Sequence, residues 1–469
     1  MNPRRLVSLL LLVLITRVAH AGPATTPNDT LHLTLDQAVA RALASGADMQ
    51  VARAGVGVAE GRIREATADA LPQIKGVVSY NHKFDSIFRG LSGADSSGLG
   101  KLFSATPFGA EHGWNVDVTA TQLLWSSGRV GAGLQAAHAV RRSATSQRDQ
   151  TMADVTLAVR EAYWAALAAQ QVVTIARDGR DQAREHLRQV ESYRRQGSRS
   201  EYDLLQAQVD ASNQEPPLVA ARSAAELALL QLKRALGLRL DQPLALDTPL
   251  AFRDTLPVTT SGPDDASARP AVKGADAIVE ARQAAVRAER AARWPQLLAT
   301  ATVSHQAFPA DGTPTRSQFH RSIDATLRLD WPIFQGLRTF GTVQRATNEL
   351  AEARAQRDAL RQAAEVELAQ ARLGVDEALA TLLARRGTAR LATRAYQLAE
   401  VRWRNGLSTQ LEVSDARLQM QNAQVNEVLA VKDYRLSLAR LERAAGRPLA
   451  TVNRSFDELT LDSTPREDR

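Results

Sequence analysis

An α+β membrane protein, in which β-hairpins alternate with very long antiparallel helical hairpins, is predicted from three observations. The chain contains an internal duplication, segments of strict apolar–polar alternation, and two proline-free helical stretches at residues 129–196 and 338–405. Aromatic residues make up only 5% of the 469 residues, which argues against a large, conventionally packed globular core. The chain is therefore interpreted as two copies of one unit rather than as several unrelated domains.

Residues 1–21 have the features of a secretory signal peptide. Two arginines precede a run of ten mostly apolar residues, and Ala19-His20-Ala21 fits the cleavage pattern. Ten residues fall well short of the ~20 that a membrane-spanning helix needs. Cleavage removes three arginines and no acid, so the net charge falls from +7 to +4 and nucleic-acid binding loses support. The sequence contains no cysteine, so we expect neither disulfides nor a lipidated cysteine at the cleavage site.

The duplication becomes visible at a constant offset of 209 residues. At this offset Gly197 aligns with Gly406 and Leu232 with Leu441, and no gap is needed. A period of this length is too long for a solenoid and indicates a duplicated fold. The predicted boundaries are 22–237 for the first repeat, 238–269 for a proline-containing connector in the equatorial region, 270–446 for the second repeat and 447–469 for a polar C-terminal tail.

Each repeat begins with a helix that a proline ends. We expect these helices at residues 34–70, with a break near Gly46, and at residues 271–294. Pro72 and Pro295 follow them, and proline neither continues a helix nor allows the preceding residue to be helical easily.

Strands come next in each repeat. The alternation of Trp114, Val116, Val118 and Ala120 with polar residues, and that of Ile323 to Ile333, indicate strands with one apolar and one polar face. Residues 74–84 and 296–307 are their expected partners, with hairpin loops at 85–112 and 309–318. A strand of this length crosses a bilayer when tilted. The apolar faces would then meet lipid, and the polar faces would line water, as represented by Asn115, Asp117, Thr326 and Arg328.

The long helices carry a narrow seam of small apolar residues. The spacing 4, 3, 4, 3, 4 occurs in both copies, and this 3.5-residue period is typical of closely packed helix pairs. The seam residues are Val155, Val159, Ala162, Ala166, Ala169 and Val173 in the first copy and Ala364, Leu368, Ala371, Val375, Ala378 and Leu382 in the second.

Glycines are expected to end these helices and polar residues to start the return helices. Gly197 and Gly406 occupy the position after the last turn. Return helices are predicted at 200–236 and 409–445, the second starting with a capping box at Thr409-Gln410-Leu411-Glu412. Pro216-Pro217 should break or kink the first of them.

Four strands per chain cannot close a barrel, and open sheet edges are not tolerated in lipid. The chain must therefore oligomerise if the strands cross a membrane. The alternative is a periplasmic coiled-coil adaptor or scaffold protein without a membrane barrel, although an adaptor would need only one helical hairpin. No set of nucleophile, base and orienting residue is present, and the eight histidines lack metal-ligand spacing. We therefore predict no enzyme activity, no cofactor and no metal site.

With these features in place, the sequence resembles the outer membrane efflux protein family, the TolC-like channels. The resemblance rests on the duplicated unit, on the strand starts Leu71-Pro72-Gln73 and Trp294-Pro295-Gln296, and on the helix turns Tyr193-Arg194-Arg195-Gln196-Gly197 and Arg402-Trp403-Arg404-Asn405-Gly406. It implies a homotrimer in which three chains form a twelve-stranded β-barrel in the outer membrane. The helices would form a periplasmic α-barrel that docks with a periplasmic adaptor (membrane fusion) protein and an inner-membrane transporter. The substrate class, whether drug, metal or protein, is left open.

The resemblance also implies a gate at the helical tips. Glu412 and Asp415, spaced i, i+3, would form a ring of six carboxylates around the closed periplasmic mouth. Asp203 matches the acid that helps to hold the mouth shut. The candidate partners for it are Arg194, Arg195, Arg199, Arg402 and Arg404. The alternative is that Asp203 and Glu412 only cap their helices.

Large aromatic residues flank the expected strand ends. They suit the aromatic girdle at a membrane interface, with ordinary strand packing as the alternative. These residues are Trp114, Trp125, Trp294, Trp331 and Phe334.

Overall fold

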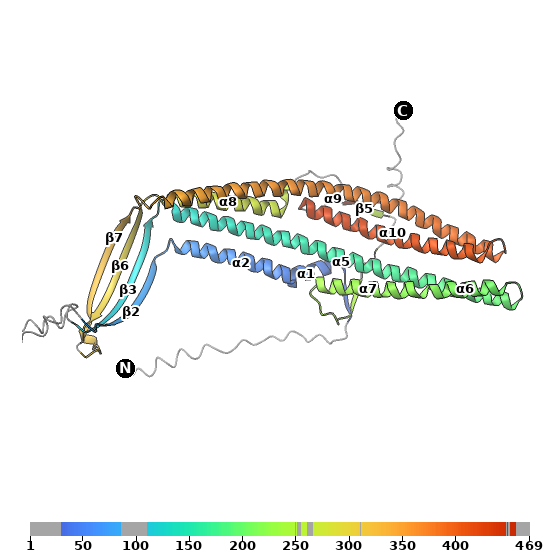
Figure 1. Ribbon diagram of the computed structural model, residues 1–469, viewed down its shortest axis with the longest axis horizontal. Helices are drawn as coiled ribbons and strands as arrows, with labels where there is room; N and C mark the ends of the chain where they lie inside the picture. The colour runs from blue at the N-terminus through green and yellow to red at the C-terminus, as the bar shows by residue number, and fades with distance from the viewer. Residues whose placement is uncertain are drawn as a thin grey trace, which may run out of the picture.

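A computed structural model shows an elongated molecule with a sheet at one end and two helical tips at the other (Figure 1). It describes residues 30–85, 110–248, 250, 255–259, 266–309, 311–446, 448 and 451–455. Within these residues no helix is both long enough and apolar enough to cross a membrane. The predicted signal peptide and most of the predicted loop 85–112 lie outside the described residues.

The four long strands form one antiparallel sheet. Their order is β2 (Gln73–His82), β3 (His112–Trp125), β6 (Gln296–Ala307) and β7 (His320–Asp330), so the hairpin of each repeat joins the other through β3 and β6. The predicted strands are confirmed, but several ends differ: β2 ends at His82 rather than at residue 84, and β3 begins at His112, within the predicted loop. β7 stops at Asp330 although the apolar alternation continues to Ile333, because Pro332 has no amide hydrogen for pairing. The short 3₁₀ helix η3 (Arg316–Gln318) lies in the loop between β6 and β7.

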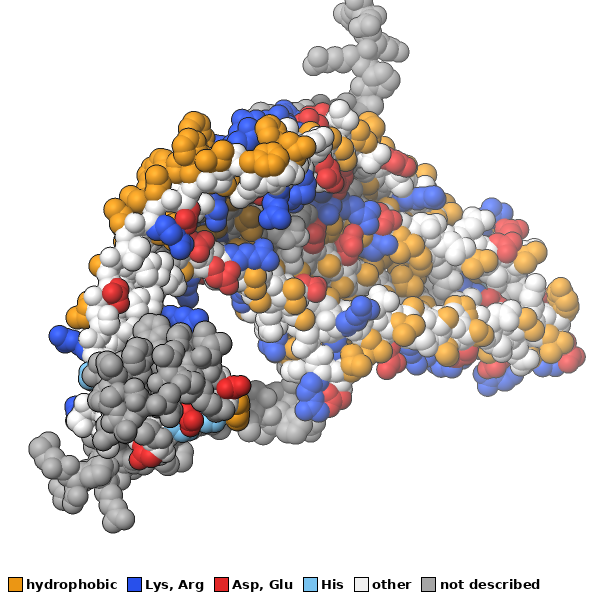
Figure 2. Space-filling view, turned by 60° about the vertical axis from the view of Figure 1, so that its left-hand side comes forward, with side chains coloured by type: hydrophobic (Ala, Val, Ile, Leu, Met, Phe, Trp, Pro, Cys, Tyr) orange, Lys and Arg blue, Asp and Glu red, His pale blue; other side chains and the backbone are white. Residues whose placement is uncertain are grey.

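The register places apolar side chains of all four strands on one face. Val118 lies opposite Gly76 on β2 and Val303 on β6, and residues directly opposite each other share a face. The next row carries polar residues, and the hydroxyls of Thr119 and Thr302 are 3.2 Å apart. Within the described residues this apolar face is largely exposed, as with Ile74 at 74%, Val78 at 69% and Leu327 at 66%. Figure 2 shows hydrophobic side chains gathered along the outer side of this end of the molecule.

Two helices of 67 residues run from the sheet to the tips. They are α5 (Arg129–Arg195) and α9 (Arg338–Arg404), and each extends about 100 Å at a rise of ~1.5 Å per residue. Most of the predicted seam packs in the core, but Ala169 and Val173 of α5 are half-buried and lie outside it. In α9 the seam continues to the tip. There the buried residues recur every seven positions, at Leu368, Val375, Leu382, Ala389, Tyr396 and Trp403.

The remaining helices pack along these two. The first repeat starts with α1 (Leu35–Ser45) and α2 (Ala47–Ala68), which are separated at Gly46 as predicted. The second starts with α8 (Pro270–Ala291), next to the 3₁₀ helix η2 (Ala266–Ala268).

The return helices differ between the repeats, as the prolines predict. The second, α10 (Gln410–Ala445), is continuous. The first is interrupted at Gln214 and consists of α6 (Glu201–Asn213) and α7 (Glu215–Ala235). Pro216 and Pro217 cannot donate hydrogen bonds back to α6, so they fit only the first turn of a new helix.

Two small sheets fasten the connector to the rest of the chain. β1 (Leu31–Leu33) pairs in parallel with β4 (Leu244–Leu246), and the Tyr163 hydroxyl of α5 donates to the Leu33 carbonyl at 2.9 Å. β5 (Thr255–Thr259) pairs antiparallel with β8 (Thr451–Ser455). The segment after residue 446 is therefore not only a polar tail, because five of its residues form β8 and pair with β5 of the connector.

Candidate gate at the helical tips

Each tip is a tight turn that a glycine makes possible. Gly197 and Gly406 both have φ of 75°, in the left-handed region that side chains other than glycine rarely adopt. The amide of Ser198 donates to the Tyr193 carbonyl at 3.0 Å, and the amide of Leu407 donates to the Arg402 carbonyl at 2.8 Å. These bonds satisfy carbonyls at the helix ends, and the two repeats form the same turn.

The two return helices are capped differently. At the first tip Ser200 Oγ accepts from the Asp203 amide at 3.1 Å, and the Asp203 carboxylate accepts from the Ser200 amide at 3.1 Å. At the second, Thr409 Oγ1 accepts from the Glu412 amide at 3.3 Å, but among the described contacts the Glu412 carboxylate does not return the bond. The predicted capping box at 409–412 is therefore only half formed, because the Glu412 carboxylate stays exposed to water instead of turning back.

Glu412 and Asp415 lie exposed on the surface of α10. Their spacing of three residues puts them on one side of the helix. Within the described residues of one chain, neither carboxylate is within ion-pair distance of a basic side chain. Both are therefore available to face a pore or a neighbouring subunit.

The predicted arginines do not meet Asp203 within one chain. Ser200 occupies the Asp203 carboxylate through its amide and also through its hydroxyl, at 2.9 Å. Arg195 is exposed at the end of α5. The other arginines have their own contacts: Glu201 for Arg194 at 3.8 Å, Glu400 for Arg404 at 3.0 Å, the Leu407 carbonyl for Arg402 at 3.2 Å and the Trp403 carbonyl for Arg199 at 3.2 Å.

Trp403 is the centre of a small core behind the tips. Its side chain is 1% exposed, and the rings of His186 and Tyr193 lie 4.3 and 5.7 Å from it between centroids. The Arg199 guanidinium lies over the ring at 5.0 Å, which is a cation–π arrangement. The sequence signal for this residue is its place in the seven-residue recurrence along α9.

His186 joins the first hairpin to the second. It is 5% exposed, and its Nε2 is hydrogen-bonded to the Gln410 side chain at the start of α10. Burial lowers the pKa of His186, and the nearby charge of Arg417 acts in the same direction. The Gln410 bond and the carboxylates of Asp210 and Glu400 oppose this shift. His186 therefore tends to stay neutral.

A buried ion pair lies further from the tips. Arg417 of α10 is 1% exposed and pairs with Asp210 of α6, which also accepts from Ser414 Oγ at 2.8 Å. Arg417 was not among the predicted site residues. The signal was its position in the buried series Gln410, Val413, Arg417 and Met420, where a charged side chain must find a partner.

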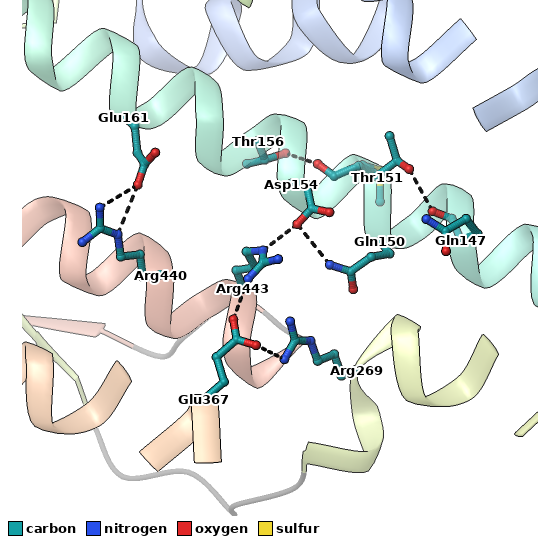
Figure 3. Close-up of polar contacts among 11 residues, drawn as sticks. Gln147, Gln150, Thr151, Asp154, Thr156, Glu161, Arg269, Glu367, Arg440 and Arg443 are labelled. Carbon is teal, nitrogen blue, oxygen red and sulfur yellow. Dashed lines mark hydrogen bonds and ion pairs between the residues drawn. The ribbon is translucent and has the colours of Figure 1, made fainter. Parts of the chain in front are cut away.

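A second charge network crosses the middle of the helices (Figure 3). Arg443 of α10 bonds to Asp154 of α5 at 2.5 Å and to Glu367 of α9 at 2.6 Å, and Glu367 also pairs with Arg269 at the start of α8. The network therefore joins both repeats far from the tips. None of its members was predicted from the sequence.

Comparison with known families decides what this arrangement is. The family described as "Outer membrane efflux protein" matches residues 38–238 and 265–447, which is most of the chain. The chain belongs to the outer membrane efflux protein family. This confirms the resemblance noted in the sequence, and it decides against the adaptor alternative.

Two curated members are similar over part of their length. The chain is 28% identical over 287 residues to the pyoverdine export outer membrane protein OpmQ of Pseudomonas aeruginosa, covering 60% of this chain and 57% of OpmQ. It is 28% identical over 300 residues to protein CyaE of Bordetella pertussis, covering 62% of this chain and 60% of CyaE. The matched part thus spans less than two thirds of these relatives.

Solved structures of outer-membrane channels share the fold. The channel OprN matches with a TM-score of 0.70 at 20% identity, covering 88% of this chain and 89% of OprN. VceC of Vibrio cholerae matches with 0.71 at 19% identity, covering 88% and 96%. The open state of MtrE of Neisseria gonorrhoeae matches with 0.71 at 18% identity, covering 88% and 89%. The α+β channel fold is thereby confirmed.

Proposed function

We propose that this protein is an export duct that passes substrates from a periplasmic adaptor and an inner-membrane pump through the outer membrane. The observation that carries the proposal is the joining, in one chain, of a two-faced four-stranded sheet to two helical hairpins based on 67-residue helices. A compact domain has no use for helices of ~100 Å, whereas a tunnel across the periplasm does. The name of OpmQ, a protein of pyoverdine export, supports the outward direction.

The height of the sheet fits a bilayer. Trp114 and Trp125 lie at opposite ends of β3 and are eleven residues apart, or about 37 Å at ~3.4 Å per residue. A strand tilt of ~40° reduces this to about 29 Å, close to the ~25 Å apolar band of outer-membrane barrels. The other four candidates for the aromatic girdle are exposed rather than packed between strands. They are Trp125, Trp294, Trp331 and Phe334.

The edges of the sheet require more than one chain, and the family resemblance indicates a homotrimer. Among the residues that the structure describes, β2 and β7 each pair with one strand. Unpaired edges cannot persist in hydrocarbon, so in a membrane each β2 must pair with a β7 from another chain. Three chains give twelve strands, and the polar faces then line the lumen.

The tips would form the periplasmic gate. In a trimer, Glu412 and Asp415 contribute six carboxylates around the mouth, and such a ring attracts cations. Asp203 is held by Ser200 at the neighbouring tip and helps to define the closed shape. The chain supplies a passage and no catalytic step, and we propose that it reaches the membrane through the signal peptide 1–21, without a lipid anchor.

The proposal is tested by isolating membranes from cells that express the full chain. We expect the mature protein in the outer-membrane fraction as a trimer that resists unheated detergent, and we expect purified trimer to form channels in planar bilayers. Recovery in the soluble periplasmic fraction without detergent would contradict the duct.

A further inference from the structure

Two histidines and a tyrosine meet at the end of the sheet that lies away from the helices. His82 of β2 and His112 of β3 are direct partners in the last pair of the register, and Tyr80 precedes His82 by two residues. All three side chains therefore lie on one face of the sheet. The two histidines are 30 residues apart in the chain, so the sequence shows no metal-ligand spacing and only the pairing of the strands brings them together.

The ligand atoms of this group are close enough to share one ion. The Nδ1 atoms of His82 and His112 are 3.2 Å apart, and the Tyr80 hydroxyl lies 2.7 Å from the same His112 nitrogen. Two nitrogens that bind one Zn²⁺ at ~2.0–2.1 Å are about 2.9–3.4 Å apart at octahedral and tetrahedral angles. The imidazole rings stack at 25°, so one ring must turn about its broad χ2 torsion for both lone pairs to point at one ion.

Hydrogen bonds alone leave the group incomplete. If His82 Nδ1 carries a hydrogen, that hydrogen and the Tyr80 hydroxyl compete for the single lone pair of His112 Nδ1. If His112 Nδ1 carries the hydrogen instead, it can serve only one of its two neighbours. A metal ion would accept a lone pair from each of the three atoms.

The other repeat supports the ligands from behind. Trp114 Nε1 donates to the Gly312 carbonyl at 2.9 Å, in the loop between β6 and β7. A Cβ atom at Gly312 would lie 3.3 Å from Cε1 of His112, so the backbone of this loop lies close to the imidazole ring. The rings of Tyr80 and Trp114 have centroids 4.9 Å apart. The ligands are thus backed by packed rings and by a second segment, which is the support that a binding site needs.

The group lies on the apolar face of the sheet and not on the polar one. His112 is six residues before Val118, an even number, so the two share a face. It is also two residues beyond Trp114, or about 7 Å at ~3.4 Å per residue. Both histidines are half-buried and Tyr80 is 48% exposed, so an ion can reach them. In the proposed barrel this place is outside the lumen and beyond the aromatic girdle, away from the path of the exported substrate.

We propose that His82, His112 and Tyr80 bind one divalent transition-metal ion per chain, with water completing the coordination. Imidazole ligands suit Zn²⁺, Ni²⁺ and Cu²⁺, whereas Mg²⁺ and Ca²⁺ prefer carboxylate and carbonyl oxygens. Among the described residues no cluster of three or more histidine, cysteine or acidic side chains could hold a metal ion, so the phenol is the third ligand. The bound ion would join β2 to β3 at the end of their hairpin and stabilise this end of the sheet.

The test is a calorimetric titration of the purified, tag-free full chain with Zn²⁺ after treatment with a chelator. We expect saturable binding of one Zn²⁺ per chain, no such binding of Mg²⁺, and a melting temperature that Zn²⁺ raises, because an ion that binds only the folded state stabilises it. Renewed addition of chelator should reverse the rise. His82→Gln and His112→Gln should each abolish the site, and Tyr80→Phe should weaken it at least about tenfold.

His320→Gln is the matched control. His320 begins β7 at the same end of the sheet, but it lies opposite Gln306 and not opposite a second histidine. We expect its Zn²⁺ affinity and its Zn²⁺-dependent rise in melting temperature to equal those of the wild type. Melting temperatures without metal, measured for every variant, separate a lost ligand from a lost fold.

The outcomes separate the metal site from the duct. Unchanged Zn²⁺ binding in the double variant His82→Gln and His112→Gln would place the ion elsewhere and overturn the site. A wild-type chain that binds no Zn²⁺ would overturn it as well, and neither result would affect the duct, which is tested by membrane fractionation and channel formation. A chain that binds Zn²⁺ as expected but forms no channel would remove the proposed function and leave the site.

Discussion

Among single residues at the tips, exposure separates two kinds of role. Glu412 and Asp415 are exposed, and within the described residues neither forms an ion pair, so both carboxylates are accessible to an ion in the proposed mouth. Asp203 is engaged in a capping box, and Trp403 is buried. The first pair is therefore expected to affect ion passage, and the other two are expected to affect the shape of the tips.

Neutralising both exposed acids tests their role at the mouth. In the double variant Glu412→Gln and Asp415→Asn, we expect the cation preference to fall and block by divalent cations to weaken, because six carboxylates of a trimer become neutral. Reversal potentials under a salt gradient measure the first effect. Glu365→Gln, an exposed acid of α9 far from the tip, is the control. Unchanged selectivity in the double variant would leave these acids only a role in the first turn of the helix.

His186 should make the tips sensitive to acid. Its pKa is lowered by burial, so between that pKa and its ordinary value of ~6.5 the unfolded chain binds more protons than the folded one. Stability therefore rises with pH in this window and is lost as the pH falls below about 6.5, by at most about 1.4 kcal/mol per pH unit.

The measurement is the melting temperature at pH 7.5 and pH 5.5. We expect a smaller difference between the two pH values in His186→Gln than in the wild type, because glutamine can still bond to Gln410 but does not titrate. His32→Gln replaces an exposed histidine and serves as the control. An equal pH dependence of the wild type and His186→Gln would show that the buried ring does not contribute.

Helices and strands of this chain end where backbone chemistry requires it. Gly446 ends α10 with φ of 67°, and a Cβ atom there would lie 2.8 Å from the Cα of Arg269. Gly406 ends α9 with φ of 75°, but a Cβ there would meet nothing within 4 Å. The two glycines thus share the same conformational demand and differ in the space around them.

Alanine at these two positions should separate strain from crowding. Gly406→Ala is expected to destabilise by about 1–2 kcal/mol, the cost of a left-handed conformation. Gly446→Ala should cost clearly more, because the backbone at Arg269 must shift and Arg269 is paired with Glu367. Melting temperatures of the two variants provide the comparison. Similar melting temperatures for the two variants would mean that the backbone at the start of α8 can shift at little energetic cost.

The elements themselves were largely predictable because local signals determine them. Proline and glycine mark the ends of α2, α5, α8 and α9, and the alternation of apolar residues marks the strands. The break at Gln214 followed from Pro216-Pro217. β8 was missed, because a short polar segment becomes a strand only through β5, about 200 residues away. The predicted bond from the Thr409 amide to the Glu412 carboxylate is not formed, because water competes for an exposed carboxylate.

The candidate site was less predictable than the fold for the same reason. The acids and glycines of the turns could be found from their spacing, since they act within a few residues. The pair of Asp210 and Arg417 spans 207 residues, and the ring contact of His186 with Trp403 joins different helices. No local pattern specifies such contacts, although a charged residue at a buried heptad position indicates that one exists.

At the scale of the whole molecule, the two long helices α5 and α9 are joined by a charge network far from the tips. The network around Glu367 joins α5, α9, α10 and the start of α8 (Figure 3). From Asp154 to Gly197 there are 43 residues, or about 65 Å of helix. A rotation of ~5° at the network would therefore move the tips by about 6 Å. In the proposed duct, a small change in helix packing at this network would therefore displace the tips, together with the small core around Trp403.

The sheet at the other end of the molecule gives a test of the proposed barrel and of the face that it turns to the membrane. Leu327 and Thr326 are neighbours near the middle of β7 and point to opposite faces, the first to the apolar face and the second to the polar face. If the apolar face meets lipid, Leu327→Lys places a charge in hydrocarbon at a cost of about 2–4 kcal/mol near the midplane, whereas Thr326→Lys places it in the aqueous lumen.

We therefore expect Leu327→Lys to reduce the amount of detergent-resistant trimer in the outer membrane, and Thr326→Lys to assemble normally with a changed ion selectivity. The comparison is made between adjacent residues of one strand, so differences in expression or strand propensity are small. Normal assembly of both variants would show that the apolar face is covered by protein. The reverse order would mean that the sheet turns its polar face outward, which a water-filled duct does not permit.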